Sequence, residues 1–91
     1  MKLILYSKPG CHLCENLQEK LEEIQADSNS PCQFDLEVRD ITTRPDWYAL
    51  YQYEVPVLYK CGDRSLTEEP IPRPSPRISA YQLEQILQKY W

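Results

Sequence analysis

The stretch that decides the fold is residues 7–17, SKPGCHLCENL. It places Cys11 and Cys14 three positions apart, directly after a short apolar run and directly before a helical pattern. Two thiols at this spacing can hold a metal ion, close a structural disulfide, or exchange electrons as a dithiol. The rest of the chain decides between these uses.

Length and charge restrict the classes of protein to which the chain can belong. Its 91 residues suffice for one modest core, so we expect a single domain over residues 1–91. The net charge of −4 disfavours binding to nucleic acid or to an anionic membrane, and we expect neither as a partner. The apolar run at residues 3–6 is too short for a signal peptide or a membrane span. We therefore expect a cytoplasmic protein with reduced thiols, and we expect it to be a monomer.

The residues around the two cysteines predict a strand, a helix and a second strand. Residues 2–6 form a short apolar run that suits a strand buried on both faces. From Cys11 onward the apolar residues recur at helical intervals, and they are Leu13, Leu17, Leu21 and Ile24. Residues 32–41 then alternate between apolar and polar, which predicts a half-buried strand near a sheet edge. A strand–helix–strand unit of this kind should be right-handed, with its two strands parallel.

A short helix and a hairpin are predicted next. Thr42 or Thr43 offers an N-cap, and Pro45 suits the first helical turn. The apolar face of this helix would hold Trp47, Leu50 and Tyr51. Residues 55–59 predict a third strand, which a turn at residues 61–64 joins to a short return strand at residues 65–69.

The last part of the chain predicts a surface segment and a final helix. Residues 70–77 contain four prolines, so we expect them to run extended over the surface. Ser79 and Gln82 stand at the spacing of a capping box, which predicts the start of a helix. The buried stripe of this helix would be Leu83, Ile86, Leu87 and Tyr90.

The position of the cysteine pair, between a strand and a helix, favours redox chemistry. A helix N-terminus exposes unpaired N–H groups and the positive end of the helix dipole, which stabilise a thiolate at Cys11. A Cys-x-x-Cys pair at a helix start lowers the pKa of its first thiol below the usual value of about 8.5. Cys11 is therefore the predicted nucleophile, and Cys14 would resolve the mixed disulfide. Lys8 and His12 are predicted to stabilise the thiolate, although His12 could equally face solvent.

Other uses of the four cysteines are open. Zinc needs four ligands, usually in two close pairs, and Cys32 and Cys61 would have to complete the set without a second Cys-x-x-Cys. We expect no metal. The pair at residues 11–14 could also be an inert disulfide or two buried thiols. For Cys32 we expect a buried thiol and for Cys61 an exposed, oxidisable one, with a second redox pair as the alternative.

Nearly the whole chain resembles the glutaredoxin branch of the thioredoxin superfamily. Residues 6–14, with Lys8 ahead of the cysteine pair, are similar to the strand, lysine and dithiol of that family. Residues 55–57, Val-Pro-Val, fall where the family has a Val-Pro pair opening its third strand. Asp40 and Ile41 resemble the end of its second strand. A Cys-x-x-Cys pair near a βαβ pattern is typical of this class.

The resemblance implies an α/β, thioredoxin-like fold of the glutaredoxin type. Its elements would follow the order β-α-β-α-β-β-α, with a four-stranded mixed sheet flanked by three helices. It also implies that Pro56 is cis and packs beside the dithiol. The Val55 backbone would then pair with an extended partner, which would be glutathione or a substrate polypeptide.

One departure from the family concerns glutathione. Glutaredoxins that use glutathione carry a Gly-Gly turn before the last helix, and this chain has only Gly10 and Gly62. Arg73 or Arg77 could bind a carboxylate instead, although we expect both to be solvated. The departure disfavours glutathione but leaves dithiol exchange intact. Glutathione therefore stays a candidate co-substrate, and we expect no other cofactor.

The function predicted from these features is that of a thiol-disulfide oxidoreductase acting through Cys11 and Cys14. Its partners would be disulfide-containing proteins or glutathione, with a thioredoxin-type reductase as a further candidate electron donor. The alternative is a non-catalytic binding module or redox sensor that docks a protein in the thioredoxin-like groove. Tyr48 and Tyr53 could line such a groove, whereas Trp47 and Tyr51 are expected in the core.

Overall fold

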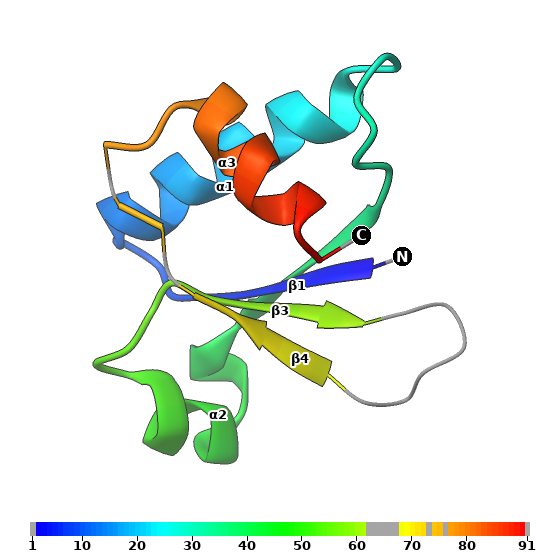
Figure 1. Ribbon diagram of the computed structural model, residues 1–91. Coiled ribbons are helices and arrows are strands. Elements are labelled where there is room, and N and C mark those ends of the chain that lie inside the picture. The colour runs from blue at the N-terminus through cyan, green and yellow to red at the C-terminus, as the bar shows by residue number, and fades with distance from the viewer. Residues whose placement is uncertain (1, 62–67, 73, 76, 91) are drawn as a thin grey trace.

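The computed structural model describes residues 2–61, 68–72, 74–75 and 77–90, and its elements follow the order β-α-β-α-β-β-α (Figure 1). This order confirms the one that the resemblance implied. The elements are β1 (Lys2–Ser7), α1 (His12–Ala26), β2 (Asp35–Asp40), a 3-10 turn (Ile41–Thr43), α2 (Pro45–Tyr51), β3 (Val57–Cys61), β4 (Glu68–Ile71) and α3 (Ala80–Gln88).

The strands form a mixed sheet in the order β2-β1-β3-β4. β1 pairs in parallel with β2 and antiparallel with β3, and β3 pairs antiparallel with β4. The parallel pairing and the edge position predicted for the second strand are therefore confirmed. Helices α1 and α3 lie together on one face of the sheet, and α2 lies on the opposite side (Figure 1).

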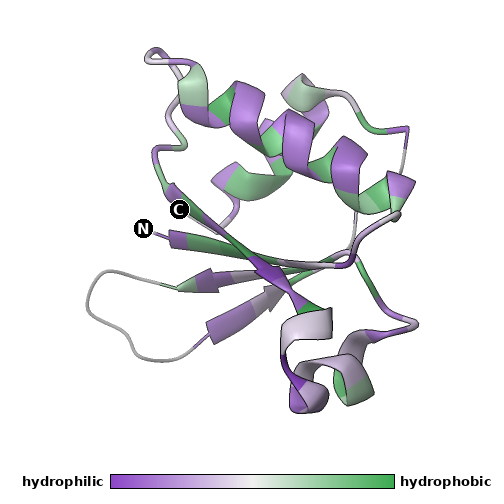
Figure 2. Ribbon diagram, turned by 180° about the vertical axis from the view of Figure 1, so that it is seen from behind, coloured by the Kyte–Doolittle hydropathy of each residue, from purple (hydrophilic) through white to green (hydrophobic). Residues whose placement is uncertain are grey.

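β1 passes through the centre of the core because both of its faces are apolar. Leu3 and Leu5 pack with the apolar residues of α1 and α3, while Ile4 and Tyr6 belong to a second cluster that also contains Val55. Hydrophobic and hydrophilic residues alternate along the two helices that cover the first face (Figure 2). Full burial of one large apolar side chain stabilises a fold by roughly 1.5–3 kcal/mol. The buried side chains on the two faces of β1 therefore stabilise the packing on both sides of the sheet.

The start of α3 confirms the predicted capping box. Ser79 Oγ accepts a hydrogen bond from the backbone N–H of Gln82 at 3.1 Å, and the Gln82 side chain accepts one from the Ser79 N–H at 3.2 Å. In the predicted stripe, Leu83 and Leu87 are fully buried, and Ile86 and Tyr90 pack half-buried against the same cluster.

The buried stripe of α1 differs from the prediction at its first position. Leu13 was expected to point inward, but its side chain is 45% exposed. Cys14 takes the inward position instead, and it is followed at helical spacing by Leu17, Leu21 and Ile24. The reason is that the helix begins at His12, which turns the second cysteine of the pair towards the sheet.

The prediction for α2 was wrong at its N-cap and at one apolar position. Asp40 caps the 3-10 turn by accepting a hydrogen bond from the Thr42 N–H at 2.9 Å, so neither threonine caps the following helix. Arg44 occupies that cap position without a capping hydrogen bond from its side chain, and Pro45 opens the helix as predicted. Leu50 is 64% exposed, because α2 is short and turns only part of its surface to the sheet.

The strands of the second half are displaced from their predicted bounds. β3 begins at Val57, not at residue 55, and the described part of the return strand is β4, whose residues include Pro70 and Ile71. Ile71 is buried opposite Leu58, which contradicts a surface segment starting at residue 70. A proline has no backbone N–H to donate, and an edge strand such as β4 tolerates Pro70 because one side of its backbone has no strand to pair with. The predicted turn at residues 62–64 and the first return residues, 65–67, lie outside the described residues.

The predicted alternation in β2 is also incomplete. The strand spans Asp35–Asp40, with Phe34 buried just ahead of it. Val38 is exposed, although the pattern placed it inward. As the edge strand, β2 has a neighbour on one side only, so this side chain is not enclosed.

Candidate active site

The cysteine pair lies at the N-terminus of α1, where the sequence predicted it. Cys11 is the N-cap residue, and its Sγ accepts a hydrogen bond from the backbone N–H of Cys14 at 3.2 Å. The loop before it turns at Gly10, whose φ of +77° lies in a region that other residues rarely adopt. The sulfur of Cys11 therefore lies among the unpaired N–H groups of the first helical turn, where a negative charge is stabilised.

The two sulfurs differ in access. Cys11 and Cys14 form a disulfide, with their Cα atoms 5.3 Å apart. Cys14 is 1% exposed, whereas Cys11 is only half-buried. An incoming thiol or disulfide therefore reaches Cys11 first.

The two predicted charge partners of Cys11 lie in different surroundings. The Nζ of Lys8 donates a hydrogen bond to the backbone carbonyl of Gln52 at 3.1 Å, just beyond the end of α2. The ring of His12 is exposed, and its nearest charged neighbour is Glu15, at 3.7 Å between Nδ1 and Oε2. His12 thus takes the solvent-facing position that the sequence left open. Nothing in the sequence indicated the contact between Lys8 and Gln52, because a lysine side chain carries no information on its partner 44 residues away.

The peptide bond between Val55 and Pro56 is cis, as the resemblance implied. Val55 packs in the same apolar cluster as Cys14, with Cys11 at its border. The N–H of Val55, however, donates to the carbonyl of Tyr51 at 3.1 Å, in the last turn of α2. This N–H is therefore already used inside the chain, which restricts the backbone pairing expected there to the Val55 carbonyl.

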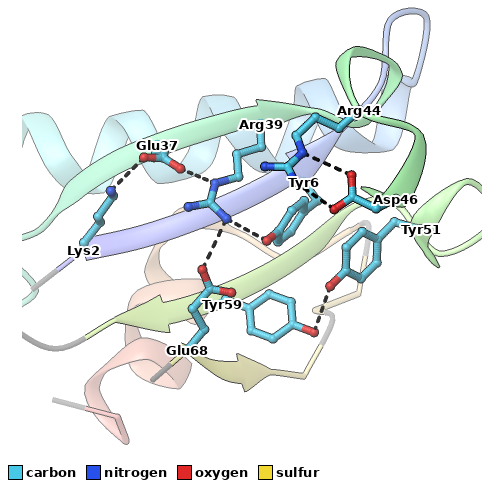
Figure 3. A network of polar contacts seen from close by, with 9 residues as sticks. All are labelled: Lys2, Tyr6, Glu37, Arg39, Arg44, Asp46, Tyr51, Tyr59 and Glu68. Atoms are coloured by element: carbon cyan, nitrogen blue, oxygen red, sulfur yellow. Dashed lines mark hydrogen bonds and ion pairs between the residues drawn. The ribbon is translucent and has the colours of Figure 1, made fainter. Parts of the chain in front are cut away.

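An aromatic cluster supports the sheet beneath this site. The ring of Tyr6 contacts those of Trp47, Tyr51 and Tyr59, with centroids 4.5–5.8 Å apart. Tyr51 and Tyr59 also join their hydroxyls at 3.4 Å (Figure 3). Trp47 and Tyr51 pack at the core as expected, while Tyr48 and Tyr53 are exposed.

Arg39 ties this cluster to the charged groups of the sheet. It donates to the hydroxyl of Tyr6 at 2.8 Å and to Glu68 at 3.2 Å, and it also pairs with Glu37 (Figure 3). Burial raises the pKa of Tyr6, although the bond from Arg39 opposes this. Burial and the contact with Tyr59 raise the pKa of Tyr51 above its usual range. These hydroxyls stay protonated near neutral pH, so the cluster is structural.

The two remaining cysteines lie on different sides of the sheet. Cys32 is fully buried with the residues of α1 and α3, as expected, and burial raises the pKa of its thiol. Cys61 ends β3 and is half-buried, so the prediction of an exposed thiol in a turn was wrong. In the described part of the chain, no three metal-ligating side chains gather at one place. Arg77 is exposed, and Arg73 lies outside the described residues.

The mixed sheet, the dithiol at the start of α1 and the cis-proline after Val55, which packs with the dithiol, define a protein of the thioredoxin class. The chain also matches solved structures of low identity across most of its length, among them the following three. Thioredoxin 1 from Thermosipho africanus is 21% identical, with a TM-score of 0.62 over 99% of this chain and 93% of that one. The target protein XcR50 from X. campestris is 24% identical, with a TM-score of 0.59 over 96% of each chain. A structure described as a malarial protein is 11% identical, with a TM-score of 0.63 over 96% of this chain and 92% of that one.

Residues 2–88 match the model of a family described as Glutaredoxin-like domain (DUF836). The chain therefore belongs to this glutaredoxin-like family of the thioredoxin superfamily. A search of curated proteins found no match. Each helix in the described ranges is too short or too polar to cross a bilayer.

Proposed function

We propose that the protein is a thiol-disulfide oxidoreductase that reduces disulfides through Cys11 and Cys14. The observation that carries the proposal is the unequal access of two bonded sulfurs at one helix N-terminus. Cys11 is accessible and accepts the Cys14 N–H, whereas Cys14 is buried behind it. Dithiol exchange needs this arrangement, because one sulfur must meet the substrate and the other must then reach the first.

The reaction transfers two electrons from the dithiol to the substrate. The Cys11 thiolate attacks one sulfur of the substrate disulfide, which forms a mixed disulfide and releases the other substrate sulfur as a thiolate that takes up a proton. Cys14 then loses its proton and attacks Cys11 Sγ. The second substrate thiolate leaves and is protonated, and the bond between Cys11 and Cys14 forms. The observed Cα separation of 5.3 Å suits that product.

The cycle needs a reductant that restores the two thiols. Glutathione and a thioredoxin-type reductase are the two candidate donors, and disulfide-containing proteins are the substrates that we propose. A partner strand would pair with the Val55 carbonyl beside Pro56, since the N–H of Val55 is bonded to Tyr51. No further cofactor enters the proposed cycle.

Turnover of a model protein disulfide tests this proposal. Reduction of insulin is measured with each of the two donors supplied in turn. It should proceed with at least one of them, and Cys11→Ser should abolish it. Cys14→Ser should instead accumulate a mixed disulfide at Cys11, which mass spectrometry detects. Cys61→Ser is the matched control, and it should leave the rate unchanged. If neither donor supports turnover and no mixed disulfide accumulates, the protein is a binding module and not an enzyme.

A further inference from the structure

An apolar pocket lies between the first turns of α1 and the described residues that precede α3, and Leu13, which stands between the two cysteines, is one of its walls. Its volume is about 160 Å³, and the described residues around it are Leu13, Asn16, Leu17, Lys20, Pro56, Pro74, Ser75 and Ile78. A cavity of about 150 Å³ lined by aliphatic side chains holds one benzene ring. The pocket therefore has the size and chemistry for one leucine or phenylalanine side chain.

The position of the pocket indicates what enters it. Leu13 lies between the two cysteines in the sequence, and Pro56 is the cis residue of the loop that packs with them. A polypeptide whose cysteine is bonded to Cys11 can extend over these two residues. An extended chain advances about 3.3 Å per residue, so a side chain close to that cysteine reaches the pocket. The exposed face of Leu13 is then covered by the substrate itself.

The N-terminus of α3 explains why glutathione fits this site poorly. A helix start binds a carboxylate through its unpaired N–H groups. Here the capping box formed by Ser79 and Gln82 already uses two of the donors at this end of the helix. Glutathione carries two carboxylates and has no large apolar side chain. The capped start of α3 leaves few N–H groups to bind its carboxylates, and glutathione has no side chain that fills the apolar pocket.

The negative charge of the protein also favours a neutral peptide over glutathione as the partner. Lys20 lines the pocket itself, but the same helix exposes Glu15, Glu19 and Glu22, and the chain has a net charge of −4. Such a surface repels a small anion more than it repels a neutral peptide segment.

We propose that this pocket selects polypeptide disulfides with a large apolar side chain within two residues of the attacked cysteine. This inference rests on the proposed oxidoreductase function and names its substrate class. An apolar side chain that enters a fitted pocket changes kcat/KM by roughly 10- to 200-fold. We therefore expect a leucine or phenylalanine peptide to be reduced at least about 10-fold faster than its alanine equivalent.

A peptide series tests the selection. Each peptide contains one cysteine in a chain of alanines, joined by a disulfide to a chromogenic thiol, with one leucine placed in turn at each of the four flanking positions. The rate of chromophore release by the reduced protein gives kcat/KM for each peptide. One position should exceed the all-alanine peptide by at least about 10-fold, and glutathione linked to the same thiol should react no faster than the all-alanine peptide.

Variants of residues that line the pocket test whether the preference for leucine peptides arises there. Leu13→Ser and Ile78→Ser should each reduce the ratio between the leucine and alanine peptides towards one, whereas Leu50→Ser, a leucine exposed on α2, should leave it unchanged. Equal rates for all peptides, with turnover intact, would overturn the pocket proposal and leave the oxidoreductase proposal standing.

A binding measurement separates the two proposals if turnover is absent. The oxidised protein is titrated with each of the four leucine peptides carrying serine in place of cysteine, and methyl NMR signals of Leu13 and Ile78 are compared with those of Leu50. Shifts confined to the pocket residues support selection by the pocket without any redox step. No shift at these residues overturns it.

Discussion

Lys8 donates a hydrogen bond from its Nζ to the backbone carbonyl of Gln52, 3.1 Å away, and this bond joins the loop before the dithiol to the end of α2. The next residues after Gln52 lead to the cis peptide bond before Pro56. The bond therefore connects the two loops between which the proposed substrate lies. From the sequence, Lys8 was predicted to act by its charge on the Cys11 thiolate, whereas the structure gives it a partner on the opposite loop.

Replacement of Lys8 separates these two roles. Lys8→Met keeps the apolar stem and removes the donor, so we expect the free energy of unfolding to fall by roughly 1–2 kcal/mol. Chemical denaturation measures this change, and alkylation of the reduced variant measures the reactivity of Cys11. Lys89→Met, at an exposed lysine just after α3, serves as the control for removal of a positive charge. Unchanged stability together with a clearly less reactive Cys11 would show that Lys8 acts by charge.

Arg39 should contribute more to stability than Arg44 does. Arg39→Met leaves the Tyr6 hydroxyl and Glu68 without their donor in a mostly buried position, so we expect a loss of about 2 kcal/mol. Arg44→Met removes an ion pair with Asp46 in which both side chains are exposed, and the loss should stay below about 1 kcal/mol. Urea denaturation of the two variants checks the order, and an equal loss for both would contradict it.

The tyrosine cluster predicts loss of stability at alkaline pH. The folded state raises the pKa of Tyr6 and Tyr51, so these groups bind protons more tightly in the folded chain than in the unfolded one. The stabilisation that these two raised pKa values provide is fully present below the tyrosine pKa of the unfolded chain, about 10. It is lost as the pH rises above that value. The thermal midpoint should fall steeply above about pH 10.

Absorbance of ionised tyrosine provides the readout for that prediction. Of the seven tyrosines in the chain, Tyr6 and Tyr51 should ionise only as the fold is lost. Tyr51→Phe should reduce the alkaline slope of stability, with Tyr53→Phe as the matched control. A variant that keeps the full slope would argue against Tyr51 as its source.

Much of the fold was accessible from the sequence because local patterns and tertiary packing agree. The apolar run of β1, the helical spacing after Cys11 and the capping box at Ser79 each specify one element, and the structure has all three. The resemblance supplied the cis bond at Pro56, which local sequence does not indicate because about 5–6% of X–Pro bonds are cis.

The structure differs from the sequence-based predictions where contacts between distant parts of the chain determine which side chains are buried. Leu13 and Leu50 have apolar side chains at helical spacing, yet both are exposed because the start of α1 and the shortness of α2 determine which faces meet the sheet. Ile71 lies within a proline-rich stretch that predicts a surface segment, but pairing opposite Leu58 buries it. For the candidate site, the cysteines and the proline followed from motifs. The contact of Lys8 with Gln52 and the internal bond of the Val55 N–H did not, because both depend on partners brought together by folding.

The pH dependence of Cys11 alkylation in the reduced protein tests the central claim most directly. Mass spectrometry of the peptide that contains Cys11 follows the reaction at this residue alone, and Cys11→Ser gives the background. We predict that Cys11 reacts as a thiolate with a midpoint between about pH 3.5 and 7.5, ahead of the buried Cys14. A midpoint near the free-thiol value of about 8.5, or Cys14 reacting first, would contradict the proposed oxidoreductase.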